Sequence, residues 1–290
     1  MKKCLLYGNC QADALKFHLN RIKEFTNEYE LVELKAVHLL NQSDVPYLID
    51  QIKKTDLFIH QPITDNYKNI KELGSNYLKS MLKEDCQVLS FPSIYFKGYN
   101  PEMIGLKDLD NRGLMGPYTY YDLNLLKAIH EGNTNINDLK NIVLNPDFYC
   151  KDEAHTSFHN SLTELKSRED ANSIDLTVTD IIENNYQKEK LFHVFNHPSS
   201  LIIFQLINKI MRLSIGSTIN YSNAPDTLSR IAYPVYMSIY KHLEFKFDNK
   251  LHYKIVQAYL DAEEYLKTLI DFVSSNHEVI KYNLERNAQV

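Results

Sequence analysis

Two side chains that can act as nucleophile and base follow stretches typical of short strands. Cys10 lies in the run Gly8–Gln11, and His197 directly precedes Pro198. A helix is expected to begin beside Cys10, and backbone N–H groups at a helix start favour a thiolate, so we expect a lowered pKa for this thiol. A cysteine nucleophile needs a base, and His197 is the candidate. The alternative interpretation of Cys10 is a small buried hydrophobic residue.

Polar groups beside these two residues are candidates for binding the substrate. Free N–H groups at a helix start can hold an oxyanion, and a glycine in the turn permits close approach of the substrate. The candidate oxyanion and substrate-binding residues are Gly8, Asn9, Gln11, Gln61 and Asn196.

A second histidine, His193, is available as a base by residue type, but its place inside a predicted strand favours a packed histidine. His193 and His197 are four residues apart, which on a helix would place two metal ligands on one face. Pro198 and the preceding apolar run favour a strand and a turn instead, and no third ligand is indicated. We therefore expect no metal site.

Two irregular segments rich in tyrosine, residues 91–101 and 116–122, are candidate binding loops. Tyrosine side chains beside a strand edge suit sugars, adenine rings or a pantetheine arm, because they combine an apolar ring with a polar hydroxyl. Lys97 and Arg112 are candidates for contacts with phosphates.

The elements that position these residues alternate between strand and helix in the first part of the chain. Apolar runs and helical spacing predict strands over 3–7, 29–37, 56–60, 87–91 and 190–195, and helices over 11–23, 44–54 and 75–83. This rhythm indicates βαβ units and a parallel sheet. Polar clusters at Gly8, His60, Pro92 and His197 end four of these strands. They are expected at one edge of the sheet, where open parallel sheets bind ligands.

The remaining chain is predicted to be mainly helical. Expected helices cover 122–130, 137–143, 153–168, 179–186, a stretch from Ser199 or Ser200 to Met211, 227–242 and 252–274. The predicted fold class is α/β, a three-layer parallel sheet of flavodoxin or SGNH type with a helical middle insertion and a helical C-terminal appendage. We assign residues 1–214 to an α/β catalytic domain and 215–290 to the appendage, whose helices offer a surface for homo-oligomerisation.

Composition narrows the function classes. The chain has 290 residues and a formal net charge of −5, with no concentrated Lys/Arg stripe, which argues against nucleic-acid binding. It has no apolar run of about 18 residues, so no transmembrane segment is expected, and the N-terminal apolar stretch is too short for a signal peptide. Four scattered cysteines without CxxC spacing argue against zinc and against a disulfide framework. These features together predict a cytoplasmic protein.

Several motifs in order resemble the WcbI-type family of capsular polysaccharide biosynthesis, to which acetyltransferase activity is ascribed. They are Gly8-Asn9-Cys10-Gln11, Gln61-Pro62, the segment Phe91-Pro92 to Tyr95-Phe96-Lys97-Gly98-Tyr99 and Pro101, and Phe195-Asn196-His197-Pro198. The resemblance covers about residues 1–212. It implies a sheet related to SGNH/GDSL esterases, binding of coenzyme A or acetyl-CoA, and acyl transfer to a sugar hydroxyl. The residues assigned to coenzyme A are Ser93, Tyr95, Lys97, Tyr118 and Tyr121.

The wider SGNH comparison supplies chemical roles. Gly8-Asn9-Cys10 resembles the Gly-Asp-Ser turn that presents the nucleophile, and His197-Pro198 resembles the end of an Asp-x-x-His-Pro element. Val194 stands where that element has its Asp, so the carboxylate that would orient His197 is missing from this position. No Gly-x-Asn-Asp element is present, which leaves Asn9, Gln11 or Gln61 to replace its oxyanion side chain.

These observations favour an acyl-CoA-dependent O-acetyltransferase that acts on a sugar, or a nucleotide-linked sugar, of a surface polysaccharide. Either Cys10 forms a covalent thioester while His197 moves the proton, or His197 activates the sugar hydroxyl directly and Cys10 only binds the thioester. One alternative is an SGNH-like esterase or thioesterase that uses the same residues. The other is a non-enzymatic binding or scaffold protein.

Overall fold

The computed structural model describes residues 1–114, 116–220, 225–256 and 258–288, and the chain forms two compact units. Unit 1 comprises Met1–Tyr95, Thr163–Asn185 and His197–Leu228, and unit 2 comprises Phe96–Leu162, Tyr186–Asn196 and Ser229–Val290. These units do not coincide with the predicted domains 1–214 and 215–290. The reason is that residues 96–162 and 186–196 pack with residues 229–290 in one unit, whereas residues 215–228 belong to the unit of the sheet.

A four-stranded parallel sheet forms the centre of unit 1, as the strand and helix rhythm predicts. Its order is β2-β1-β3-β4, with β1 at Lys2–Tyr7, β2 at Tyr29–Leu31, β3 at Leu57–His60 and β4 at Gln87–Ser90. The prediction that the strand over 190–195 extends this sheet is wrong. β7 (Phe192–Val194) is a short strand of unit 2 and does not belong to this sheet.

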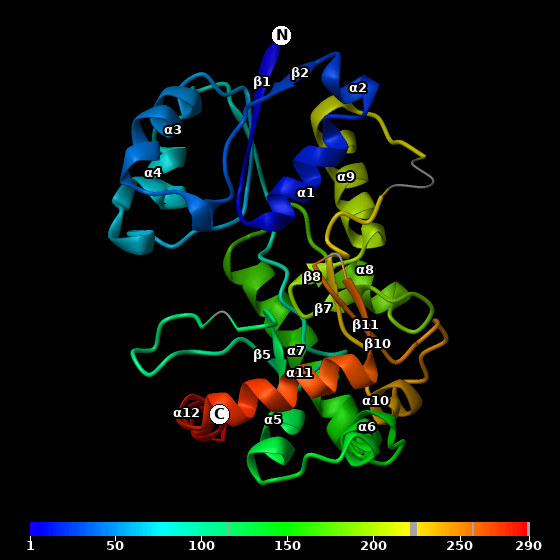
Figure 1. The fold of residues 1–290 in the computed structure, drawn as a ribbon. Helices are drawn as coiled ribbons and strands as arrows, with labels where there is room; N and C mark the ends of the chain where they lie inside the picture. Colours follow the sequence, from blue (N-terminus) through cyan, green and yellow to red (C-terminus); the bar gives the residue numbers. More distant parts are fainter. Residues whose placement is uncertain (115, 221–224, 257, 289–290) are drawn as a thin grey trace. The chain divides into compact units, whose positions relative to one another are not determined.

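Helices cover both faces of this sheet, so unit 1 has three layers. Figure 1 shows α3 and α4 on one side of β1, and α1 with α9 on the other. The helices of unit 1 are α1 (Cys10–Leu19), α2 (Lys23–Thr26), α3 (Val45–Ile52), α4 (Ser75–Lys79), α8 (Thr179–Asn185) and α9 (Ser200–Ile215). Its 3₁₀ helices are η1 (Val37–Leu39), η2 (Gln42–Asp44), η3 (Tyr67–Asn69) and η4 (Lys71–Leu73). The remaining short strand is β8 (His197–Pro198).

Strand alternation divides the core of unit 1 between the two faces. Leu5 and Phe58 pack with Leu48 of α3 and Leu78 of α4 in one hydrophobic cluster. Residues one position along in each strand face the other way, toward α1, which packs on β1. The polar groups that follow the strands lie at the carboxyl end of the sheet, where the chain turns.

Unit 2 joins helices to small antiparallel sheets. Its elements are β5 (Met103–Ile104), β6 (Tyr121–Asp122), α5 (Leu123–His130), α6 (Ile136–Leu144), β7, β9 (Ile231–Ala232), α10 (Met237–His242), β10 (His252–Ile255), β11 (Ala258–Asp261), α11 (Ala262–Ser275) and α12 (His277–Asn287). α7 (Lys151–Ala171) passes from unit 2 into unit 1 after Leu162. The predicted helix 252–274 is wrong at its start, because residues 252–255 and 258–261 form two strands of the sheet β11-β10-β9. The predicted helix 227–242 is likewise reduced to β9 and α10.

Aromatic rings form much of the core of unit 2. The ring of Tyr99 contacts Phe96, Phe192 and Phe245 at centroid distances of 5.9, 5.9 and 4.8 Å. Gly98 sits against this cluster, because a Cβ there would lie 2.4 Å from the Phe96 ring. Phe96 and Tyr99 of the 91–101 segment are therefore core residues and not part of a ligand-binding loop.

Candidate active site

The turn after β1 places Cys10 at the first residue of α1. Asn9 caps the helix, because its side-chain oxygen accepts the Gln11 backbone N–H at 2.8 Å. Cys10 is half-buried and has a free thiol. The sequence prediction that a helix begins at this turn is confirmed, and it presents the thiol beside the first amides of the helix.

Two buried glutamines brace this turn. The Gln61 side-chain oxygen accepts the backbone N–H of Asn9 at 2.8 Å, and its amide group donates to the Gln11 side-chain oxygen at 2.8 Å. Gln11 in turn donates to the carbonyl of Ile94 at 2.8 Å and accepts the Ile94 N–H at 3.0 Å. Gln61 also donates to Pro92 at 3.2 Å. The side-chain amides of Gln11 and Gln61 thus connect the three segments that directly follow β1, β3 and β4.

Gly8 is required at the centre of this arrangement. A Cβ on Gly8 would lie 2.6 Å from the Gln61 side-chain oxygen, which is closer than non-bonded atoms approach. Register explains the proximity, because Tyr7 of β1 is paired with His60 of β3, immediately before each turn. Any side chain at position 8 must therefore displace the amide that holds Asn9.

The predicted lowering of the Cys10 pKa is wrong in direction. Burial raises the pKa of this thiol, and the Asp13 carboxylate one helical turn away raises it further. The backbone N–H groups of Cys10 and Gln11 act in the expected, lowering direction but are outweighed. The resting group is therefore a thiol, and nucleophilic attack requires a base that removes its proton.

His197 lies in unit 1 at the start of β8, just before α9. α9 packs against α1, the helix that begins at Cys10. Figure 1 shows the two helices running the same way, with their first residues at the same end of unit 1. Cys10 thus begins one helix and His197 shortly precedes the neighbouring one, and their pairing stays a prediction.

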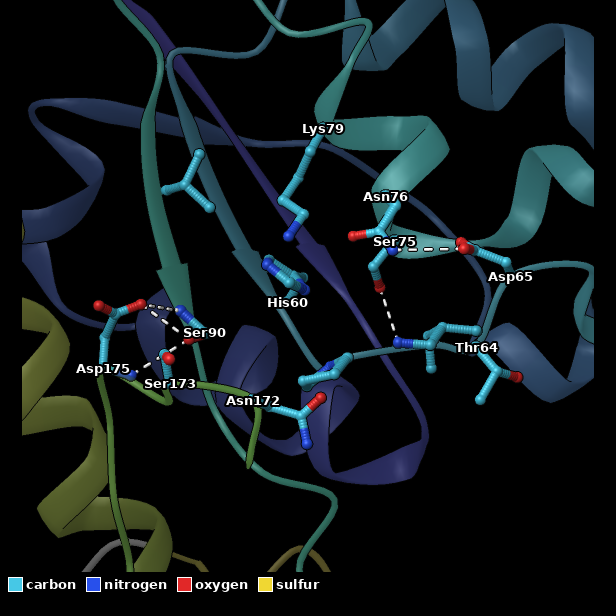
Figure 2. A pocket seen from close by; sticks show the side chains of 13 residues that line it. His60, Thr64, Asp65, Ser75, Asn76, Lys79, Ser90, Asn172, Ser173 and Asp175 are labelled. Carbon is cyan, nitrogen blue, oxygen red and sulfur yellow. Dashed lines mark hydrogen bonds between the residues drawn. The ribbon is translucent and has the colours of Figure 1, made fainter. Parts of the chain in front are cut away.

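A polar pocket opens beside the brace, on the face of the sheet that carries α4. We call it the β3–β4 pocket; its volume is about 600 Å³. Figure 2 shows its polar lining side chains, His60, Thr64, Asp65, Ser75, Asn76, Lys79, Ser90, Asn172, Ser173 and Asp175. The Asp175 carboxylate accepts the backbone N–H and the hydroxyl of Ser90 at 2.8 and 2.7 Å.

His60 gives this pocket a defined hydrogen-bond acceptor. Its Nδ1 lies 3.1 Å from the Gln61 carbonyl oxygen, and because a carbonyl only accepts, Nδ1 carries the proton. Burial lowers the pKa of His60, so the ring is neutral and Nε2 is its acceptor. Figure 2 shows Lys79 extending toward this ring. Gln61 therefore connects the pocket, through its carbonyl, to the Cys10 turn, through its side chain.

Comparison with known families settles the class of protein. The model of the polysaccharide biosynthesis enzyme WcbI matches residues 3–215. The chain belongs to the WcbI family. It also resembles a solved structure of WcbI, itself described as a novel polysaccharide biosynthesis enzyme and as the native protein without a disulfide bond between coenzyme A and one of its cysteines. That likeness has a TM-score of 0.79 at 23% sequence identity and covers 98% of each chain, so it shows a shared fold. No curated protein sequence matches this chain.

In this member of the WcbI family, the predicted substrate-binding amides are structural. Gln11 and Gln61 are fully buried, and the polar atoms of both side chains bond within the brace. The Asn9 oxygen is occupied by the helix cap. These three residues therefore position the turn. Asn196 lies in unit 2, where its side chain donates to the Tyr120 hydroxyl at 2.6 Å.

The residues predicted to bind coenzyme A separate into two groups. Ser93 and Tyr95 flank Ile94 in the loop held by Gln11, and their carbonyls accept hydrogen bonds from Arg168 at 3.1 and 2.7 Å. Lys97, Tyr118 and Tyr121 lie in unit 2. Tyr118 is buried with its hydroxyl on the Tyr265 carbonyl, and Tyr121 is buried with its hydroxyl near the Tyr118 N–H. Both tyrosines are core residues, so we remove them from the candidate site.

Sequence reasoning missed Arg168 and most of the β3–β4 pocket. Arg168 and Asp175 belong to a stretch predicted only as helix and connection, and nothing in its pattern indicates contact with the end of β4. His60 was visible in a polar cluster after a strand, which is the one signal available for this pocket. Among the described residues, no helix has the length and apolar character to span a membrane, and no three His, Cys, Asp or Glu side chains are placed to hold a metal ion.

Proposed function

We propose that this polysaccharide biosynthesis enzyme transfers an acyl group from coenzyme A to a sugar hydroxyl, with Cys10 as nucleophile and His197 as base. The observation that carries the proposal is the brace of Gln11 and Gln61. It fixes a half-buried cysteine at a helix start where three strand ends meet. Such rigid support of one thiol is what a nucleophile needs and what a packed core cysteine does not need.

Coenzyme A is proposed from the family and from the site together. The solved WcbI structure is described by reference to a disulfide between coenzyme A and a cysteine, which concerns that protein. For this chain we assign the corresponding role to Cys10, the cysteine at the start of α1. Ser93 and Tyr95, in the loop that Gln11 holds, are the neighbouring groups we assign to the pantetheine arm.

The first half of the reaction loads the acyl group. His197 removes the proton from the Cys10 thiol, and the sulfur attacks the thioester carbonyl carbon of the acyl-CoA. The backbone N–H of Cys10, which already acts on the sulfur, stabilises the oxyanion. The bond from the carbonyl carbon to the coenzyme A sulfur breaks, and the leaving thiolate takes the proton from His197.

The second half delivers the acyl group to the acceptor. His197 takes the proton of a sugar hydroxyl, and the oxygen attacks the carbonyl carbon of the Cys10 thioester. The carbon–sulfur bond breaks and the proton returns to the Cys10 sulfur, which restores the free enzyme. The raised pKa of Cys10 makes its thiolate a poorer leaving group, so His197 must return the proton to the sulfur as this bond breaks.

We assign the acceptor sugar to the β3–β4 pocket. Its volume of about 600 Å³ is in the usual range for small-molecule sites. Lys79 contributes one positive charge, and Asp65 and Asp175 contribute two negative charges, while His60 is neutral. Such a lining disfavours phosphates and suits a neutral ligand with many hydroxyls, which needs both donors and acceptors.

Release of coenzyme A from acetyl-CoA, measured with and without candidate sugar acceptors, tests the function. We expect acceptor-dependent release that falls about 10²–10⁴-fold in His197→Gln and is lost in Cys10→Ser. Cys86→Ser is the matched control, because Cys86 is also half-buried and has a pKa raised by burial. Release at one rate regardless of acceptor indicates a hydrolase. Full transfer in both Cys10→Ser and His197→Ala contradicts the mechanism.

A further inference from the structure

A second pocket, in unit 2, is built on the outer face of strand β10. Tyr253 points inward from this strand and stacks on the buried Tyr265 at a centroid distance of 3.7 Å. By strand alternation, His252 and Lys254 point to the opposite face. Lys254 is paired with Ala232 of β9 on one side and Tyr259 of β11 on the other, so these residues form the floor of the pocket.

Positive side chains surround this floor. The pocket, which we call the β10 pocket, has a volume of about 310 Å³ and is lined by Lys190, His193, Ser229, Ala232, Tyr233, Asp248, Lys250, His252, Lys254 and Tyr259. Three lysines face a single carboxylate, that of Asp248. Asp248 lies 3.0 Å from Lys250, so these two charges offset each other at the rim. The charges of Lys190 and Lys254 remain.

Lys190 gives the strongest indication that this pocket binds an anion. It is partly buried, and its ammonium group donates to the Tyr233 carbonyl at 3.0 Å, with no carboxylate within 4.0 Å among the described residues. Burial lowers the pKa of Lys190 to about 8, and Asp248 opposes this only partly. A desolvated charge without a counter-ion is costly, and an anion placed in the pocket would remove that cost.

An aromatic ring completes the pocket. Tyr259 is 66% exposed, and the Lys254 ammonium lies 5.1 Å from the centre of its ring. An exposed tyrosine beside lysines offers a stacking surface for a planar base next to groups that bind phosphate. The combination is that of a nucleotide site, whereas the described lining of the β3–β4 pocket has neither a tyrosine or phenylalanine ring nor an excess of lysines.

We propose that the β10 pocket binds the phosphate groups of a nucleotide-bearing substrate through Lys190 and Lys254, with its base against Tyr259. This inference rests on the proposed function only for the source of the nucleotide. Acyl transfer from coenzyme A to a sugar offers two sources with the same chemistry, the phosphorylated adenosine of coenzyme A and the diphosphate of a nucleotide-linked sugar.

Calorimetric titration with inorganic pyrophosphate, ADP, UDP and coenzyme A tests the site in the full chain. We expect pyrophosphate and at least one nucleotide to bind, and Lys190→Met and Lys254→Met each to weaken that binding by at least about tenfold. Lys267→Met is the matched control, because Lys267 is an exposed lysine of unit 2 that pairs with Glu263 on α11. Thermal unfolding of each variant shows whether the fold is intact.

Comparison of the four ligands identifies which substrate supplies the nucleotide, and a further measurement separates this proposal from the acyl-transfer mechanism. Loss confined to coenzyme A and ADP assigns the pocket to coenzyme A, and loss confined to UDP assigns it to the acceptor; either supports the site. Acetyl-pantetheine lacks the nucleotide, so acylation of Cys10 by this compound should be unchanged in Lys190→Met and Lys254→Met. Absence of binding by all four probes at millimolar concentration, or equal binding by both variants and the wild type, overturns the proposal.

Discussion

The β3–β4 pocket of unit 1 and the β10 pocket of unit 2 differ in charge, although both are open to small ligands. The first has two carboxylates, one lysine and a neutral histidine, and the second has three lysines and one carboxylate. Because of this difference in charge, we assign the hydroxyl groups of the sugar to the β3–β4 pocket and the phosphate groups of the nucleotide to the β10 pocket. The difference also shows that the chemistry of acyl transfer and the recognition of a nucleotide can be tested independently.

The largest expected effect comes from breaking the brace in unit 1. Gln61→Met keeps the side-chain volume but leaves the Asn9 N–H without its acceptor, which costs about 1–3 kcal/mol of unfolding free energy. Because the Cys10 turn then shifts, we expect acyl transfer to fall about 10²-fold. Binding of pyrophosphate to the β10 pocket should be unchanged. Normal transfer in a folded Gln61→Met protein would remove the positioning role of the brace.

A substitution in the β3–β4 pocket should weaken binding of the sugar acceptor and leave binding of acetyl-CoA unchanged. Lys79→Met removes the one positive charge of this pocket, and we expect the KM for the sugar acceptor to rise about tenfold. The KM for acetyl-CoA should not change. Lys53→Met, at the end of α3 and outside the pocket, is the control. A selective rise in the acetyl-CoA KM would instead assign this pocket to the acyl donor. It would contradict the assignment of the sugar acceptor to the β3–β4 pocket.

The β10 pocket should respond to alkaline pH. The pKa of Lys190 is about 8, so its ammonium is largely protonated at pH 7 and largely neutral at pH 9. The other titratable groups that line the pocket with it are His193, Tyr233, Asp248, Lys250, His252, Lys254 and Tyr259. We expect pyrophosphate affinity to fall by up to about tenfold from pH 7 to pH 9. Calorimetry should show a flatter profile in Lys190→Met; an identical profile would exclude Lys190 as the titrating group.

The smallest expected effect concerns the Cys10 thiol. Asp13 raises the pKa of Cys10, so Asp13→Asn should lower that pKa and speed alkylation of Cys10 by iodoacetamide severalfold at neutral pH. Peptide mapping reports the alkylation rate, and Cys150, which is exposed, serves as an internal reference. A slower reaction would mean that the Asp13 carboxylate assists the thiol.

The same comparison explains what could be predicted from the sequence. The site of unit 1 follows three strands whose apolar runs are local signals, and so the parallel sheet and the Cys10 turn were predictable. The partners of Gln61 were not, because they depend on the register that sets Tyr7 beside His60. Local pattern also suggested a lowered Cys10 pKa, since helix-start amides are visible in the sequence and burial is not.

The pocket of unit 2 could not be predicted. Its residues come from three separate stretches, around Lys190, around Tyr233 and from Asp248 to Tyr259. The alternation of residues 252–255, an inward tyrosine between two outward polar residues, is a strand pattern. The sequence pattern nevertheless predicts a helix that includes these residues, because an amphipathic helix follows at Ala262. The stacking of Tyr253 on Tyr265 is a tertiary contact that favours the strand over a helix at this position.

Intact-protein mass spectrometry after brief exposure to acetyl-CoA, without an acceptor, tests the central claim most directly. We predict one added acetyl group, located on Cys10 by peptide mapping, absent in Cys10→Ser, retained in Cys86→Ser and lost when the sugar acceptor is supplied. An enzyme that transfers the acyl group to a sugar with no acetyl ever found on Cys10 would contradict the covalent mechanism and leave direct activation of the hydroxyl by His197.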